Sequence, residues 1–178
     1  LNLDEITNNP NGSWLKESGA RFFIVGALSY GSLGVYALGL KVAMLVKLIG
    51  TAFNLTWSPM QIELFAQNQS ERKFALAINY YMIAMFLGIV LLTSASPLLI
   101  SILGTSDYYS AIKIVGFIAT SYLWDGSISI LATGNNWSRK TYYNSFGSIA
   151  GGLIVLAMLW IGIEEYGLLA AAFSLMIG

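Results

Sequence analysis

The residues best suited to chemistry in this sequence are polar side chains set at helical spacing inside apolar stretches. One predicted helix face carries four of them at i, i+4, i+7 and i+11 spacing: Lys47, Thr51, Asn54 and Ser58. Tyr36 lies on the same face, about three turns earlier. An ammonium group flanked by hydroxyl and amide groups can bind an anion and hydrogen-bond other polar groups. The stripe therefore predicts a binding surface with Lys47 as its charged member.

Two further cations lie near this stripe. Arg21 can hold a phosphate through two parallel hydrogen bonds, or it can pair with Glu17 one helical turn earlier. Lys41 lies roughly 120° around the predicted helix from Lys47, at 100° per residue. Lys41 can either bind a ligand or extend its ammonium group to a nearby aqueous surface. Both uses stay open for each residue.

Asp125 is the acidic counterpart of these cations. It shares one predicted helix face with four other polar residues, namely Ser121, Tyr122, Ser129 and Asn136. A carboxylate inside an apolar stretch can pair with a lysine, bind a cation or carry a proton. We expect Asp125 to serve either in such a pair or in ion coupling.

The elements that must position these residues are long apolar segments. Residues 74–104 contain no charged residue, 114–137 contain only Asp125, and 141–163 again contain none. About 20 apolar residues in a helix are enough to cross a bilayer. The pattern predicts an all-α, polytopic transmembrane helix bundle.

The sign of the charge alternates between these segments. Because basic loops tend to stay in the cytoplasm, loops 64–73 and 136–140 are predicted to be cytoplasmic. Loops 104–109 and 163–166 are then periplasmic or extracellular. The charges that mark the loops, in chain order, are Arg72 and Lys73, Asp107, Arg139 and Lys140, and Glu164 and Glu165.

Composition agrees with a membrane protein and disfavours an enzyme. The chain is 56% hydrophobic and 10% charged, with a mean hydropathy of +0.67. It contains no cysteine and no histidine, which removes thiolate and imidazole metal ligands and the commonest general base. The sequence predicts no catalytic residues, no metal site, no cofactor and no nucleic-acid partner.

Turn residues and charges divide the chain into five full helices and a shortened sixth. A break is expected at residues 31–34, and the third helix is expected to bend or end near Pro97. The chain begins without methionine and stops inside an apolar run, so residues 1–178 are expected to be one helical lobe of a larger protein. The predicted helices are 12–32, 35–63, 74–103, 110–135, 141–162 and 166–178.

Five segments, in this order, resemble motifs of the Wzx-type polysaccharide flippases. These proteins belong to the multidrug/oligosaccharidyl-lipid/polysaccharide exporter superfamily. Two positions depart from the family pattern: Ala20 stands where an acidic residue often precedes the arginine, and Ala170 stands where glycine is usual. The segments are SWLKESGARFFI at 13–24, LGVYALGLK at 33–41, FNLTWSP at 53–59, YYSA at 108–111 and EYGLLAAA at 165–172.

The resemblance implies the second lobe of a two-lobe transporter that opens alternately to either side of the bacterial inner membrane. Its cargo would be a polyprenyl-diphosphate-linked oligosaccharide for cell-surface polysaccharides such as O-antigen of lipopolysaccharide. Membrane lipids would surround the lobe, and H⁺ or Na⁺ coupling is left open. The residues expected to bind the diphosphate and sugar headgroup are Arg21, Lys41, Lys47, Asn54 and Tyr36.

Three alternatives remain at this stage. A cation-coupled multidrug antiporter of the same superfamily would favour carboxylates such as Asp125 over three cations. A membrane-embedded glycosyltransferase would need a long external loop, and the loops here are short. A scaffold would have little reason to place charges inside apolar helices.

Overall fold

The computed structural model describes residues 20–66, 70–137 and 142–178, and these residues form helices and no strand. This confirms the predicted all-α class. A short helix at 20–27 precedes the long ones. The later elements are α3 (Tyr30–Ala66), α4 (Ser70–Leu103), the 3-10 helix η1 (Ser106–Ala111), α5 (Ile112–Trp137), α6 (Tyr142–Tyr166) and α7 (Leu168–Ile177).

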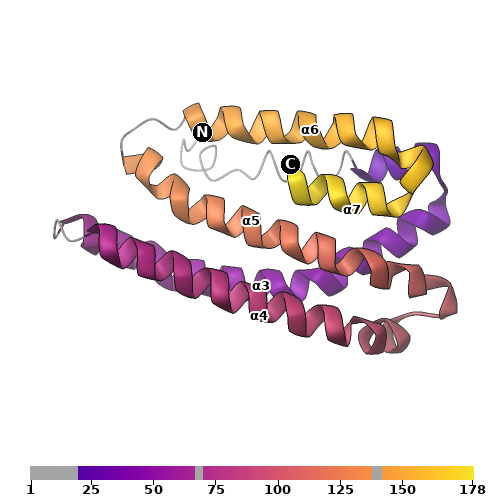
Figure 1. The fold of residues 1–178 in the computed structure, drawn as a ribbon, viewed down its shortest axis with the longest axis horizontal. Helices are drawn as coiled ribbons and strands as arrows, with labels where there is room; N and C mark the ends of the chain where they lie inside the picture. The colour runs from indigo at the N-terminus through magenta and orange to yellow at the C-terminus, as the bar shows by residue number, and fades with distance from the viewer. Residues whose placement is uncertain (1–19, 67–69, 138–141) are drawn as a thin grey trace, which may run out of the picture.

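The long helices run alternately in opposite directions along the molecule (Figure 1). α3 packs against both α4 and α5, and α4 also packs against α5. α7 lies against α5 and α6, which touch each other at few positions. The turn from α3 to α4 is at one end of the molecule, and η1 and the α6–α7 turn are at the other (Figure 1).

The break before α3 comes earlier than the sequence predicted. It lies at Leu28 and Ser29, so the prediction of a break at 31–34 is wrong. The Ser29 Oγ accepts a hydrogen bond of 3.1 Å from the Ser32 backbone N–H, and the Ser29 carbonyl accepts one of 3.1 Å from Leu33. Ser29 therefore acts as the N-cap of α3. Helix-capping by the serine decides the boundary, and the glycines at 31 and 34 are helical.

α4 continues past Pro97 and ends at Leu103, as the predicted helix 74–103 does; of the two possibilities left open at Pro97, an end of the helix is therefore not observed. Proline cannot donate a hydrogen bond to the carbonyl four residues earlier, which here belongs to Thr93. The buried Ser96 hydroxyl donates to that carbonyl at 2.8 Å. The serine thus replaces the missing donor, which explains why the helix tolerates the proline.

The remaining boundaries differ from the prediction by a few residues. α5 runs to Trp137, two residues beyond its predicted end. α6 extends to Tyr166, and Gly167 then adopts a left-handed conformation with φ 56°. Glycine is favoured at such a turn because it has no Cβ. The turn lets α7 fold back beside α6.

Three helices are long and apolar enough to cross a membrane within the described residues: Tyr30–Trp57, Arg72–Leu103 and Ile149–Tyr166. They indicate a membrane protein. α5 has 26 residues, which is about 39 Å at 1.5 Å per residue, but it is not among the three. Its second half is richer in polar residues, including Asp125, Ser127 and Thr133. Its predicted membrane crossing stays a prediction.

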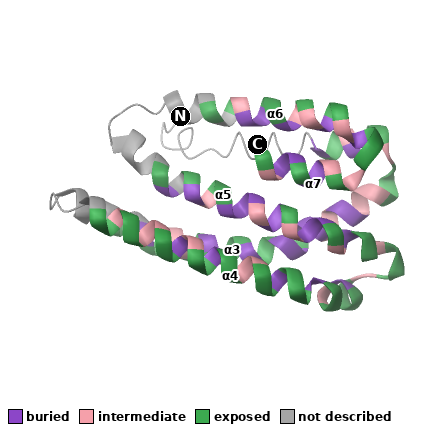
Figure 2. Cartoon of the chain, viewed as in Figure 1, coloured by how far each residue is buried: buried purple, intermediate pink, exposed green. Residues whose placement is uncertain are grey.

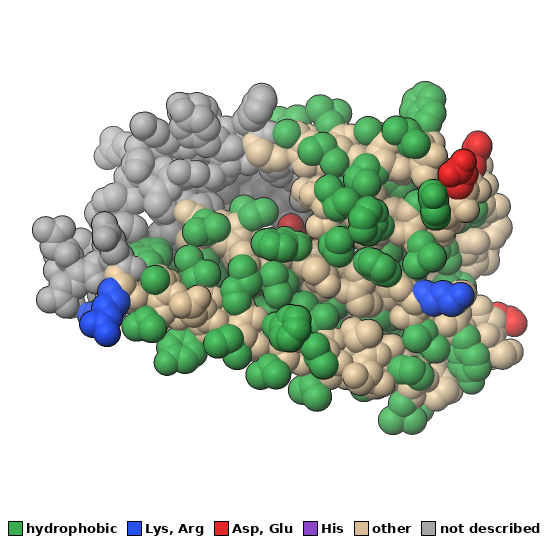
Figure 3. All heavy atoms as spheres, in the orientation of Figure 1, with side chains coloured by type: hydrophobic (Ala, Val, Ile, Leu, Met, Phe, Trp, Pro, Cys, Tyr) green, Lys and Arg blue, Asp and Glu red, His purple; other side chains and the backbone are tan. Residues whose placement is uncertain are grey.

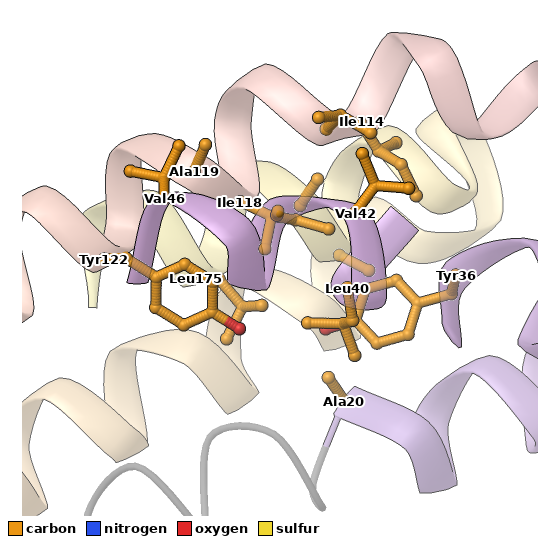
Figure 4. Packing of buried hydrophobic residues seen from close by; sticks show 14 of the residues in the cluster. Ala20, Tyr36, Leu40, Val42, Val46, Ile114, Ile118, Ala119, Tyr122 and Leu175 are labelled. Atoms are coloured by element: carbon orange, nitrogen blue, oxygen red, sulfur yellow. The ribbon is translucent and has the colours of Figure 1, made fainter. Parts of the chain in front are cut away.

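The buried core lies where α3 meets α5, and the outer sides of α4 and α6 are exposed (Figure 2). Val42 and Val46 of α3 face Ile114 and Ile118 of α5 in Figure 4. Gly39 allows this close packing, because a Cβ there would lie 2.9 Å from the Ile114 Cδ1. Large apolar side chains such as Phe86 and Leu91 of α4 point outward, as expected for a helix that contacts lipid.

Candidate functional site

Lys47 of the predicted α3 stripe contacts the face of α5 that carries Asp125. The Lys47 ammonium lies 5.1 Å from the centroid of the Tyr122 ring, within the range of a cation–π interaction. Tyr122 is buried, whereas Lys47 is exposed on the surface of the bundle. The ring therefore contacts the charged end of the lysine side chain, which stays on the surface of the bundle.

Asp125 follows Tyr122 by three residues in α5, which places it on the same helix face. It is exposed, and the next residue, Gly126, lies against the hydroxyl of Tyr81 in α4. Lys47 of α3 and Asp125 of α5 thus belong to one region. Lys47 contacts it through the Tyr122 ring, and Tyr81 contributes to it from α4. We call this group, Lys47, Tyr81, Tyr122 and Asp125, the charged crossing.

Tyr81 is the member of the charged crossing that the sequence analysis missed. It is 1% exposed, whereas its neighbour Tyr80 is 65% exposed. The Tyr81 Oη would be 3.4 Å from a Cβ on Gly50 of α3, and a Cβ on Gly126 of α5 would overlap it. Two glycines from different helices thus make room for one phenol. The sequence does not show which of these two adjacent tyrosines is buried, because that depends on how α4 packs against α3 and α5.

Ring packing holds Tyr81 in this position. The Phe53 ring meets the Tyr81 ring edge to face, with centroids 5.1 Å apart. Within the described part of the chain, the Tyr81 Oη has no hydrogen-bond partner. A buried hydroxyl left unpaired typically costs about 1–3 kcal/mol. The packing of the ring between α3 and α5 offsets this cost.

The other residues of the predicted stripe differ in how far they are buried. Thr51 is exposed and donates its hydroxyl hydrogen to the Lys47 carbonyl at 3.0 Å, so this hydroxyl is bonded within its own helix. Asn54 is half-buried. Tyr36 is fully buried and lies beside Leu40 and Ala20 in Figure 4. The side chain of Ser58 lies outside the described residues.

The other two predicted cations, Arg21 and Lys41, do not belong to the charged crossing. Arg21 is exposed on the short helix at 20–27, and Lys41 is exposed on α3. Lys41 precedes Lys47 by six residues, which is about 9 Å along the helix axis. Glu17, the alternative partner of Arg21, lies outside the described residues.

The charges at the helix ends follow the predicted alternation in sign. Figure 3 shows basic side chains at the end of the molecule where α4 begins and acidic side chains at the opposite end, together with one basic patch there. Arg72 and Lys73 lie at the first end, and Asp107 and Glu164 lie at the second. All four are exposed. Antiparallel helices thus gather charges of one predominant sign at each end of the bundle.

Comparison of the chain with family models, with curated proteins and with solved structures found no match. Within the described residues, no group of three or more His, Cys, Asp or Glu side chains is arranged to hold a metal ion. The function must therefore be argued from the charged crossing and from its place in the apolar bundle.

Proposed function

We propose that this protein is a helical lobe of a membrane transporter that moves a lipid-linked, anionic headgroup across the bilayer. The observation that carries the proposal is the position of two exposed lysines in the apolar span Tyr30–Trp57. Lys41 and Lys47 stand on either side of the midpoint of this span, each within about 6 Å along the axis. A lysine at this depth costs about 2.5–3.5 kcal/mol if it faces lipid.

An exposed charge at the middle of the membrane needs water or a polar partner. Within a lobe, the side that bears such a charge is expected to line a cavity between this lobe and another. The outer face of α4 carries large apolar side chains instead, which favours lipid on that side. The exposed side of α3 thus carries two charges beside apolar residues such as Leu48, whereas the exposed side of α4 carries none after Lys73. This difference supports transport more than a scaffold role.

The cargo that fits best is a polyprenyl-diphosphate-linked oligosaccharide. Its diphosphate would bind to Lys47, with Lys41 and Arg21 as further cations, and its sugars would hydrogen-bond polar groups such as Asn54. The order of the five sequence segments supports the same choice. The transport step makes and breaks no covalent bond, and the membrane would be the bacterial inner membrane with the basic end of the bundle in the cytoplasm.

A second candidate is a cation-coupled antiporter, and one observation favours it. Asp125 is an exposed carboxylate beside the buried phenol of Tyr81, an arrangement able to attract a cation or to carry a proton. In the flippase proposal the same carboxylate would serve coupling by H⁺ or Na⁺. The two candidates differ in whether Lys47 or Asp125 is needed for binding the cargo.

The test is a flipping assay with the protein reconstituted in vesicles. A fluorescent polyprenyl-diphosphate oligosaccharide is placed in one leaflet, and its appearance in the other is measured. Lys47→Ala is expected to lower the rate at least about tenfold, because a charge-assisted contact contributes roughly 1.5–3 kcal/mol. Lys113→Ala serves as the control, since Lys113 is an exposed lysine at the start of α5.

The control variant should retain the rate of the unchanged protein. Equal rates for Lys47→Ala and the unchanged protein would contradict the headgroup role. If Asp125→Asn abolished efflux of a cationic drug while Lys47→Ala had no effect on it, the antiporter would replace the flippase.

A further inference from the structure

A groove between α3 and α4 adjoins the charged crossing through Phe53, which packs on Tyr81, but none of the four residues of the crossing lines it. It has a volume of about 440 Å³, within the usual range of roughly 300–1,000 Å³ for small-molecule sites. Its lining is almost entirely apolar and aromatic, with one basic residue. The residues that matter here are Phe53, Trp57, Met60, Leu76, Tyr80 and Lys73.

Aromatic contacts hold the inner wall of this groove in shape. The Phe53 and Trp57 rings stack with centroids 6.2 Å apart. The Trp57 and Phe74 rings meet edge to face at 4.9 Å and 86°, which ties the end of one helix to the start of the next. Trp57 is 4% exposed. The groove is therefore formed before any ligand binds.

The groove lies where two apolar spans reach the basic end of the bundle. One span ends at Trp57 and the other begins at Arg72. Only 22% of the second span is buried in the protein, so this side faces outward to lipid. Exposed Arg72 and Lys73 lie at the groove's end of α4, and Lys73 lines it.

We propose that the α3–α4 groove binds one anionic phospholipid of the surrounding membrane. Its acyl chain would lie against Trp57 and Leu76, and its phosphate would contact Lys73, with Arg72 beside it. The apolar lining excludes a water-soluble anion as the main occupant, because burying its polar groups there would leave them without hydrogen bonds. A basic residue at the mouth of an apolar groove between helices is complementary to an anionic lipid, since such pockets bind anionic headgroups on the cytoplasmic side.

Tryptophan fluorescence tests this directly. The protein is reconstituted in vesicles that contain either brominated phosphatidylglycerol or brominated phosphatidylcholine, and quenching is measured as a function of lipid fraction. Trp57→Phe identifies the part of the quenching that comes from the groove. That part is expected to be stronger with phosphatidylglycerol. Lys73→Gln is expected to lower this preference about fivefold, and Lys73→Arg should keep it.

Two further variants make the result decisive. Lys113→Gln removes an exposed lysine at the start of α5, at the end of the bundle opposite to Lys73 (Figure 1), and it should retain the preference. Ala77→Phe is expected to fill the groove, because Ala77 lines it, and so to abolish its quenching with either lipid. Equal quenching by the two lipids, or a preference unchanged in Lys73→Gln, would overturn the proposal. Displacement of quenching by a polyprenyl phosphate but not by unbrominated phosphatidylglycerol would overturn it too, by assigning the groove to the cargo.

Discussion

α3 and α4 are neighbouring helices of similar length, with 37 and 34 residues, but they meet different surroundings. The apolar span of α3 is 44% buried, and that of α4 is 22% buried. α3 carries Lys41 and Lys47 within its span, whereas α4 has no charged residue after Lys73. We infer that the exposed lysines of α3 meet water or a polar partner, whereas the exposed side chains of α4 meet lipid.

The largest expected difference between the two helices is in the cost of removing a leucine. Leu40 of α3 is 2% exposed, and Leu91 of α4 is 69% exposed. Leu40→Ala is expected to lower the free energy of unfolding by about 2–5 kcal/mol, because it leaves a cavity. Leu91→Ala should lower it by less than about 1 kcal/mol, since lipid or detergent can refill the space.

Denaturant titration in the same detergent measures both variants. Equal losses of stability would mean that α4 is packed as tightly as α3, and the contrast between the two helices would disappear.

A smaller effect is expected at the glycine that makes room for Tyr81. Gly126→Ala would place a Cβ into the Tyr81 hydroxyl, and the ring cannot move away freely because Gly50 of α3 lies behind it. Overpacking of this kind typically costs about 1–3 kcal/mol. The loss of stability should appear in the same denaturant titration.

Gly147→Ala in α6 is the matched control. No atom lies within 4 Å of a Cβ built on Gly147, so this helical substitution should be neutral or should stabilise by about 0.5–1 kcal/mol. If both glycine variants behaved alike, α3, α4 and α5 would not meet as closely as described.

Much of the fold follows from local features of the sequence. Apolar stretches bounded by charges predicted α4, α5 and α6 to within a few residues, since a charge in the middle of a membrane helix is costly. The break before α3 was misplaced for a local reason. The prediction rested on the glycines at 31 and 34, whereas the helix begins earlier because Ser29 caps it. The continuation of α4 through Pro97 depends on one hydroxyl of Ser96, which a propensity argument does not include.

The candidate site was only partly predictable, for a different reason. Helical periodicity placed Tyr122 and Asp125 on one face, and Lys47 on another helix, since each of these is a property of a single helix. That Lys47 sits over Tyr122 depends on the register between α3 and α5. The burial of Tyr36 and the insertion of Tyr81 between two glycines depend on that register too, and one sequence does not encode it in any readable pattern.

The central claim is that the lysine side of α3 faces water, whereas the outer face of α4 contacts lipid. The chain contains no cysteine, so Lys47→Cys and Leu91→Cys can be labelled in the native membrane without further changes. A membrane-impermeant thiol reagent reacts with the thiolate, which forms in water and is disfavoured in lipid. The cysteine at 47 is expected to be labelled many times faster than the cysteine at 91. Equal rates, or faster labelling at 91, would contradict it.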